Sequence, residues 1–219
     1  MYFSAEVEGG NAHHCVGTAT ASAILGPWTA SDTPFACNLT IGGAIDASGF
    51  RDVDGKRYVT YKVDGNSIGH GGTCNNEVAP IVATPLILQE VEADGVTKVG
   101  EGITILDRTD ADGPLVEAPS IMRSASGIYT LFFSSGCFTE SSYNVNYATS
   151  KSVRGPYTRA ATPIATTGQY SLSAPGGATG LEDGEDGMPS VAFHADCDQG
   201  RCMHTSRLMQ KQTTISLVL

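Results

Sequence analysis

The sequence has little charge and no long apolar run. Only 16% of its 219 residues are charged, and 13 Lys and Arg stand against 23 Asp and Glu, a net charge of −10. This excess of acid would repel phosphate groups, which argues against nucleic acid and anionic membranes as partners. No stretch approaches the roughly 20 apolar residues of a membrane helix, and the residues directly after Met1 already have the pattern of a strand rather than a leader peptide. Neutral carbohydrate remains a compatible ligand.

An internal repeat dominates what the sequence does contain. Four strand-like segments carry an aromatic anchor, and they recur at intervals of roughly 60–70 residues when they are aligned on Phe3, Tyr61, Phe133 and Phe193. Turn-forming dipeptides precede the last three segments, as they do between antiparallel strands. Repeats of about 60 residues with three or four short strands each are typical of β-propeller blades. We therefore predict one all-β domain over residues 1–219, with no helix of ordinary length.

Six cysteines are few for this length, but their number is even. They could form the three disulfides of a secreted protein or remain buried thiols, and we expect a secreted, extracellular protein. Connectivity cannot be derived from sequence. The plausible pairs are Cys15 with Cys37, Cys74 with Cys137, and Cys197 with Cys202.

Two carboxylates stand near the start of predicted inner strands. Asp46 precedes Tyr61 by nearly the same separation as Glu117 precedes Phe133, so the repeat places both acids at equivalent positions. Inner strands surround the propeller axis, where such positions converge. Glycoside cleavage requires two acids brought together, one of them kept protonated for the leaving oxygen. The alternative is a pair of strand-end acids that accept backbone hydrogen bonds, but their recurrence in apolar settings favours catalysis.

Residues 44–61 (AIDASGFRDVDGKRYVTY) and 117–136 (EAPSIMRSASGIYTLFFSSG) resemble two motifs of glycoside hydrolase family 43. The resemblance implies a five-bladed β-propeller that hydrolyses arabinose- or xylose-containing plant polysaccharides, mostly with inversion. Carried over by position, Glu117 would be the general acid and Asp46 the residue that modulates its pKa and orients it. Ser135 and Arg201 are further candidates for sugar contacts.

The sequence departs from this pattern in its first blade. The repeat places that blade's inner strand, with the general-base Asp, about 13 residues before Met1, so we expect a propeller incomplete at the first blade. Glu6 or Glu8 is a candidate substitute base, although a solvated rim is the simpler interpretation. Without a base the chain would be a non-catalytic carbohydrate-binding propeller. The exposed edge at residues 1–5 predicts aggregation, pairing with a second copy, or upstream residues, and a strand at 213–219 would build the fifth blade.

The fourth copy also departs from the family. Residues 175–178 (PGGA) stand where the family often has Gly-His, which removes an imidazole from the axis. We predict no cofactor and no metal. His13 and His14 lie beside Cys15, but no further ligands follow at a metal-binding spacing. A structural calcium ion at an acidic turn is conceivable, although a solvated hairpin tip is favoured; the turn contains Asp183, Glu185 and Asp186.

Overall fold

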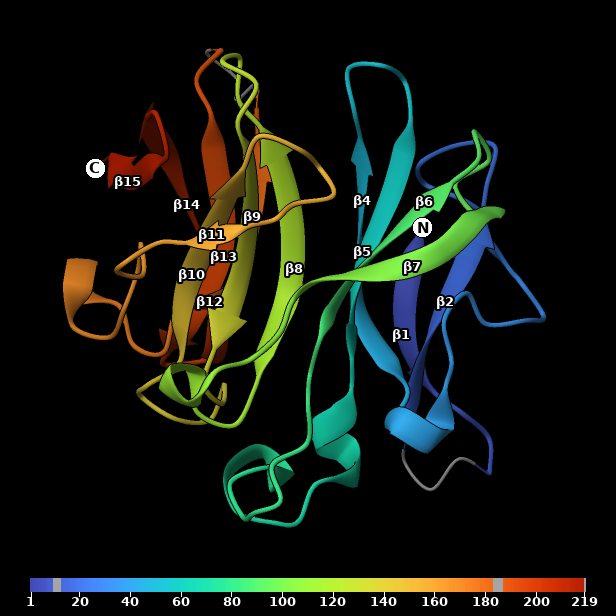
Figure 1. Ribbon diagram of the computed structural model, residues 1–219, viewed down its shortest axis with the longest axis horizontal. Coiled ribbons are helices and arrows are strands. Elements are labelled where there is room, and N and C mark those ends of the chain that lie inside the picture. Colours follow the sequence, from blue (N-terminus) through green and yellow to red (C-terminus); the bar gives the residue numbers. More distant parts are fainter. Residues whose placement is uncertain (10–12, 183–186, 219) are drawn as a thin grey trace.

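The computed structural model describes residues 1–9, 13–182 and 187–218, and these fold into four antiparallel sheets (Figure 1). Each sheet follows the order of the chain. The first contains β1 (Tyr2–Glu6), β2 (His14–Thr20) and β3 (Thr29–Ala30). The second contains β4 (Ala44–Arg51), β5 (Arg57–Val63), β6 (Leu86–Val91) and β7 (Lys98–Leu106). The third contains β8 (Val116–Arg123), β9 (Tyr129–Ser135), β10 (Asn144–Ser150) and β11 (Thr158–Arg159). The fourth contains β12 (Gly176–Leu181), β13 (Ser190–Cys197), β14 (Gly200–Lys211) and β15 (Thr214–Val218).

The helices of the described residues are five short 3-10 turns, and none is long and apolar enough to span a membrane. They are η1 (Leu39–Ile41), η2 (Gly65–Ile68), η3 (Thr73–Asn75), η4 (Asp110–Asp112) and η5 (Gln169–Ser171). Both η2 and η3 belong to the connection between β5 and β6, which extends below the sheets in Figure 1. The all-β prediction is therefore confirmed for the part of the chain that the structure describes.

The four sheets are the blades of a β-propeller, as the repeat predicted. The described residues form four blades rather than five, and the first has three strands where the others have four. The prediction that the C-terminal strand builds a fifth blade is wrong. A tight turn after Lys211 brings Thr214 back opposite it, so β15 pairs with β14 at the outer edge of the fourth sheet.

Buried hydrophobic clusters hold adjacent blades together. Phe35 lies in a cluster between the first and second blades, Tyr58 packs with Leu131 between the second and third, and Phe132 packs with Phe193 between the third and fourth. In β9 every residue is buried, because this strand lies between two such clusters. Burial of side chains this large stabilises the fold by about 1.5–3 kcal/mol for each residue.

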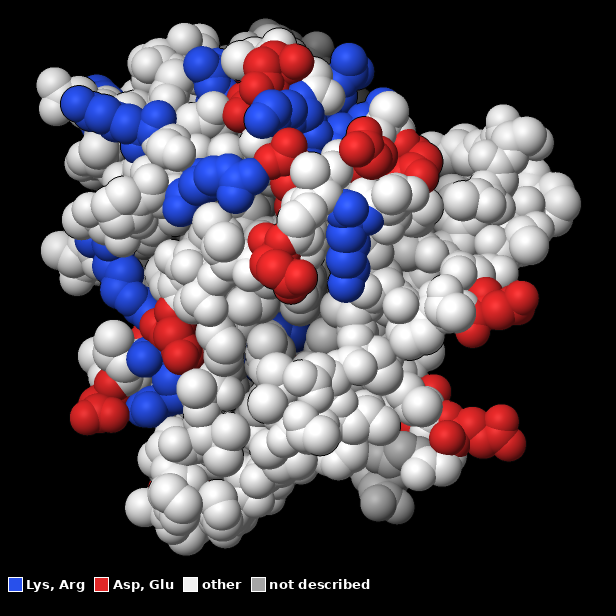
Figure 2. Space-filling view, turned by 45° about the vertical axis from the view of Figure 1, so that its right-hand side comes forward, with Lys and Arg blue, Asp and Glu red and all other residues white. Residues whose placement is uncertain are grey.

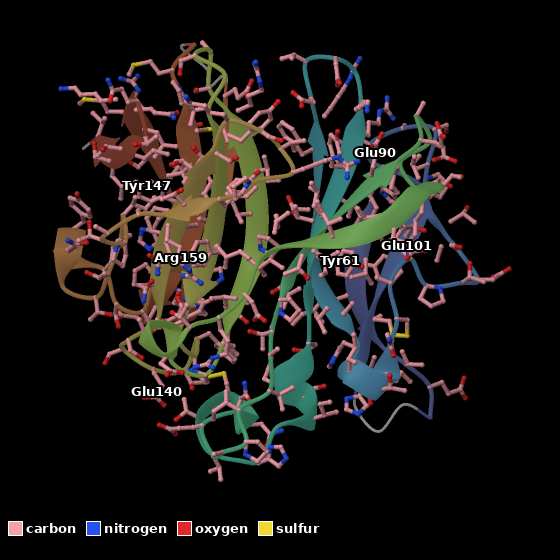
Figure 3. The ribbon with its side chains drawn as sticks, in the orientation of Figure 1. Tyr61, Glu90, Glu101, Glu140, Tyr147 and Arg159 are labelled. Atoms are coloured by element: carbon pink, nitrogen blue, oxygen red, sulfur yellow. A yellow bond between two sulfur atoms is a disulfide. The ribbon has the colours of Figure 1, made fainter. Side chains whose placement is uncertain are left out.

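Three disulfides reinforce the blades, and they are the three plausible pairs: Cys15–Cys37, Cys74–Cys137 and Cys197–Cys202. The second bridge joins the η2–η3 connection of the second blade to the loop after β9 in the third. It is the yellow bond near Glu140 in Figure 3. The third closes the β13–β14 hairpin.

Charged side chains of both signs alternate on the face shown in Figure 2. Glu90 of β6 forms ion pairs with Lys56 of its own blade and with Arg154 of the next. Figure 3 labels Glu90 at the upper end of the second blade. Such surface pairs add little stability individually.

Candidate active site

A bulge interrupts each of the three inner strands, β4, β8 and β12, shortly after its start. The register shifts lie between Ile45 and Ser48, between Glu117 and Ser120, and between Gly176 and Thr179. The first bulged residue is left-handed in every case, with φ of 59° at Asp46, 52° at Ala118 and 63° at Gly177. Left-handed backbone is strained for residues other than glycine and is concentrated at functional sites. The bulges therefore aim three equivalent positions at the axis.

The register shows that Asp46 and Glu117 are not equivalent, so this prediction is wrong by one position. Ile45 pairs with Lys62 and, at the same position of the next blade, Glu117 pairs with Ser134. Asp46 comes next in the chain, in the bulge itself. A slightly longer separation between acid and aromatic in the third copy was the only sign of this offset in the sequence. The two acids thus approach each other from different backbone positions rather than by simple repetition.

The residue after each aligned aromatic forms what we name the axial ring: Ser4 of β1, Lys62 of β5, Ser134 of β9 and His194 of β13. Two of its members bind the bulge of the following blade. The Ser4 hydroxyl accepts the Asp46 N–H at 3.1 Å, and the Ser134 hydroxyl accepts the Gly177 N–H at 2.8 Å. The axial ring therefore connects the blades through hydrogen bonds to otherwise unpaired bulge amides.

Asp46 takes the same role where the ring has a lysine. Its Oδ2 accepts the Ala118 N–H at 3.0 Å, since the Lys62 ammonium has no acceptor to offer. Burial raises the pKa of Asp46 to about 6, the negative charge of Glu117 adds to this rise, and Lys62 opposes it. A carboxyl that titrates near neutrality beside a second carboxyl is the arrangement found where one proton is shared for acid–base chemistry.

Glu117 is held from two sides. The Tyr143 hydroxyl donates to its Oε1 at 2.5 Å, and the Lys62 Nζ lies 3.7 Å from its Oε2. The Glu117 side chain is 14% exposed, whereas Tyr143 is fully buried. Burial and the charge of Glu117 raise the pKa of Tyr143, so its hydroxyl stays protonated and remains a donor. The Tyr143 ring fits only because residue 176 is glycine: a Cβ there would lie 1.9 Å from the ring.

An imidazole does reach the axis, contrary to the prediction from the PGGA segment. It is His194, which comes from the second strand of the fourth blade instead of the inner strand. Gly177 makes room for it, since a Cβ there would lie 2.3 Å from Nε2. Arg201 donates its Nε–H to Nδ1 at 2.7 Å, which leaves the proton of the neutral ring on Nε2. Burial and the charge of Arg201 lower the pKa of His194, so the neutral ring is favoured.

Asp46 and His194 border a cavity of about 310 Å³ on the axis. That volume matches the lower end of small-ligand sites. Its walls come from the bulges of the three inner strands and from β13: Asp46, Ala47, Ser48, Ala118, Pro119, Gly177, Ala178, Thr179 and His194. Asp46 is a wall residue, and Glu117, which interacts with Asp46 electrostatically, directly precedes the wall residue Ala118 without lining the cavity itself. The cavity therefore places a sugar-sized space beside Asp46 and His194.

The two candidate sugar contacts differ in their placement. Arg201 adjoins the cavity through His194, and its other nitrogens donate to the Ala174 and Phe138 carbonyls and to Asp196. Ser135 lies outside the cavity. It is buried and donates to Asp112 Oδ1 at 2.6 Å.

Asp112 is the centre of a separate buried network near η4. Arg159, labelled in Figure 3, donates to its Oδ1 at 2.9 Å, and Thr109 donates to its Oδ2. Burial opposes ionisation, but the hydrogen bonds from Ser135 and Thr109 and the charge of Arg159 hold the pKa of Asp112 below its ordinary value. We assign this network a structural role, because the Asp112 carboxylate is already occupied by Ser135, Thr109 and Arg159 and makes no contact with the axial acids.

Glu6 and Glu8, the candidate substitute bases, are both exposed, and neither is a wall residue of the axial cavity.

The candidate calcium ligands at 183–186 lie outside the described residues. Within the described part of the chain, no three His, Cys, Asp or Glu side chains are grouped to hold a metal ion. His13 instead hydrogen-bonds the Ser67 hydroxyl at 3.0 Å.

Comparisons with solved structures place this geometry in context. A thermostable family-43 glycoside hydrolase is similar with a TM-score of 0.80 at 21% identity, over 99% of this chain and 70% of that chain. An endo-1,4-β-xylanase from Bacteroides thetaiotaomicron VPI-5482 gives 0.73 at 19% identity, over 99% and 74%. An α-L-arabinanase of Cellvibrio cellulosa, complexed with arabinohexaose, gives 0.71 at 17% identity, over 99% and 72%. At these identities the similarity shows the propeller fold.

No match was found among curated proteins. The sequence model of the glycosyl hydrolases family 43, however, matches residues 1–216, nearly the whole chain. The resemblance of the two motifs is thus confirmed, and the chain belongs to glycosyl hydrolase family 43.

Proposed function

We propose that this protein hydrolyses arabinose- or xylose-containing plant polysaccharides by inversion, with Glu117 as the general acid and Asp46 as the pKa modulator that orients it. The observation that carries the proposal is the pairing of these two acids at the propeller axis, where Asp46 lines the axial cavity and its pKa is raised by the charge of Glu117. In the proposed step Glu117 gives its proton to the glycosidic oxygen as the bond to the anomeric carbon breaks, while water attacks that carbon from the opposite face and passes its proton to a general-base carboxylate.

The hydrogen bond from Tyr143 supports this assignment. It occupies Oε1 of Glu117 as an acceptor, which leaves Oε2 as the oxygen that carries the proton to the substrate. His194 would present its Nε2–H to a sugar hydroxyl in the cavity, fixed in that tautomer by Arg201. Neutral donors and acceptors of this kind suit an uncharged carbohydrate.

Activation of the attacking water requires a further carboxylate. Glu6 and Glu8 remain the candidates, at the end of β1 and in the loop after it.

Three disulfides support a secreted protein, since such bonds persist in oxidising compartments. The second candidate function, a non-catalytic carbohydrate-binding propeller, keeps the cavity and its donors but has no base.

Hydrolysis of arabino- and xylo-oligosaccharides tests the proposal, beside p-nitrophenyl arabinofuranoside and xylopyranoside. Glu117→Gln should lose about 10²–10⁴-fold in turnover of the oligosaccharides. The loss should be smaller on the nitrophenyl glycosides, because nitrophenolate departs without a proton. Binding of oligosaccharides by the unmodified chain without any turnover would support the binding propeller instead. Equal turnover of the oligosaccharides by the unmodified chain and by Glu117→Gln would show that Glu117 is not the general acid.

A further inference from the structure

Lys62 is out of place in the axial ring if the ring only connects blades. At the same position Ser4 and Ser134 accept a bulge amide from the next blade. A lysine cannot accept that bond, and the Ala118 amide is satisfied by Asp46 instead. The second blade therefore loses the connecting hydroxyl and gains a cation beside Glu117.

The cation is deeply buried and fully engaged. Lys62 is 1% exposed, and its Nζ lies 3.0 Å from Asp64 Oδ1, 2.7 Å from Asn66 Oδ1 and 3.7 Å from Glu117 Oε2. Burial of an ammonium costs several kcal/mol unless it is paired. Asp64 supplies the countercharge, so the approach to Glu117 is additional to what burial alone requires.

The Lys62 side chain is anchored by the disulfide-bonded connection of its own blade. Asn66, the nearest partner of the ammonium, donates to the Cys74 carbonyl at 3.4 Å and accepts at its own carbonyl from Asn75 at 2.9 Å. Cys74 is bridged to Cys137 in the third blade, the blade that carries Glu117. The bridge thus links the blade of the cation to the blade of the acid.

Several titratable or charged groups of the described residues face this point: Asp46 of β4, Asp64 after β5, Glu117 of β8, Tyr143 before β10, and His194 of β13 with its partners Arg201 and Asp196. Arg201 lies over the Tyr143 ring and donates to His194. Lys62 is the cation that lies beside Glu117 and opposes the raised pKa of Asp46. When Glu117 delivers its proton, a negative charge appears beside the Lys62 ammonium in a site of low dielectric, where such an interaction is strong.

We propose that Lys62 is a positioning residue that holds the Oε2 side of the Glu117 carboxyl and stabilises the carboxylate left after proton delivery, opposite Tyr143 on Oε1. This inference rests on the proposed role of Glu117 as the general acid. The arrangement assigns one oxygen of the acid to a neutral donor and the other to a cation. It also explains the presence of a lysine at a ring position where two other blades have a hydroxyl.

Lys62→Met tests the inference, with Lys56→Met as the matched control, because Lys56 is an exposed lysine of the same blade that pairs with Glu90. We expect Lys62→Met to lose at least 10-fold in kcat on oligosaccharides and only a few-fold on nitrophenyl glycosides. The basic limb of its pH–rate profile should move about one unit higher, because removal of a nearby cation favours protonated carboxyls. Lys62→Arg should restore the position of that limb. Equal losses on both substrate classes with an unmoved limb would mean a structural lysine only.

A second readout does not depend on turnover. In ¹³C-labelled protein the carboxyl carbon of Asp46, assigned with Asp46→Asn, should titrate about one pH unit higher in Lys62→Met and at the original pH in Lys56→Met, because Lys62 lowers the pKa of Asp46. If Lys62→Met fails to fold because Asp64 is left unpaired, Lys62→Met with Asp64→Asn removes both charges of the pair. If the carboxyl titration in Lys62→Met is the same as in the unmodified protein, the inference is overturned. If the titration shifts but the unmodified protein hydrolyses none of the substrates, only the proposed enzymatic function is overturned.

Discussion

Asp46→Asn is expected to stabilise the folded protein at neutral pH and to leave its stability near pH 4 unchanged. Asparagine keeps the size of the side chain and an oxygen for the Ala118 N–H, so the change removes mainly the charge. The pKa of Asp46 is raised from 3.8 to about 6 by burial and by Glu117. At about 1.4 kcal/mol per unit, ionisation of Asp46 costs the folded state up to about 3 kcal/mol.

The sign follows from proton binding. Between about pH 4 and pH 6 the folded protein retains a proton that the unfolded chain has lost, so the free energy of unfolding falls as the pH rises. The cost is absent below that window and complete above it. Relative to the unmodified protein, Asp46→Asn should therefore gain about 1–3 kcal/mol at pH 7 to 8. Urea unfolding followed by circular dichroism, with the disulfides intact, measures this difference at each pH.

Asp94→Asn is the matched control with the opposite sign. Hydrogen bonds from the Thr97 hydroxyl and amide lower the pKa of Asp94, so its contribution to stability is present at neutral pH and lost as the pH falls. This variant should be destabilised at pH 7 and approach the unmodified protein in acid. A gain for Asp46→Asn that is equal at pH 4 and pH 8, or a loss at pH 8, would refute the assignment of the raised pKa to Asp46.

Three further changes test other parts of the structure. Gly176→Ala should displace Tyr143, because the new Cβ would lie 1.9 Å from its ring. The kcat of this variant should fall at least 10-fold, and the double variant Gly176→Ala/Tyr143→Leu should have the same kcat as Gly176→Ala alone. Replacing both Cys74 and Cys137 by serine should cost about 4 kcal/mol of unfolding free energy, given a separation of 63 residues, and a denaturant series with and without reductant would detect it. Asp112→Asn should cost about 2–4 kcal/mol at pH 7. That cost should shrink in acid, where the normal carboxylate also becomes protonated, and a pH-independent cost would contradict the lowered pKa of Asp112.

The blades could be predicted because the repeat lies in local pattern: each anchoring aromatic is followed directly by a member of the axial ring. The repeat also predicted that Asp46 and Glu117 converge on the axis, because their separations from Tyr61 and Phe133 are nearly equal. Their offset by one position could not be found, since a bulge changes register without a distinct composition. Only the small difference between their separations from Tyr61 and Phe133 indicated it.

Lys62, Tyr143 and His194 were missed because their roles depend on contacts between blades. Tyr143 reaches Glu117 across a gap that only Gly176, from a third segment, leaves open. The same glycines were interpreted as the loss of an imidazole, whereas Gly177 is what admits His194. A signal existed for two of them, since Lys62 and His194 occupy the ring position next to an aligned aromatic. Tyr143 lies between strands, where the repeat gives no guidance.

The axial ring has a consequence for how such a protein can diversify. Each ring residue lies in a strand that pairs in the same way with the next strand of its blade. A hydroxyl, an ammonium or an imidazole therefore occupies the ring position on the same backbone conformation. Each group also depends on the bulge residue of the adjoining inner strand, as His194 depends on Gly177 and Lys62 on Asp46. Directed evolution of the protein would therefore best vary each ring position together with its bulge residue.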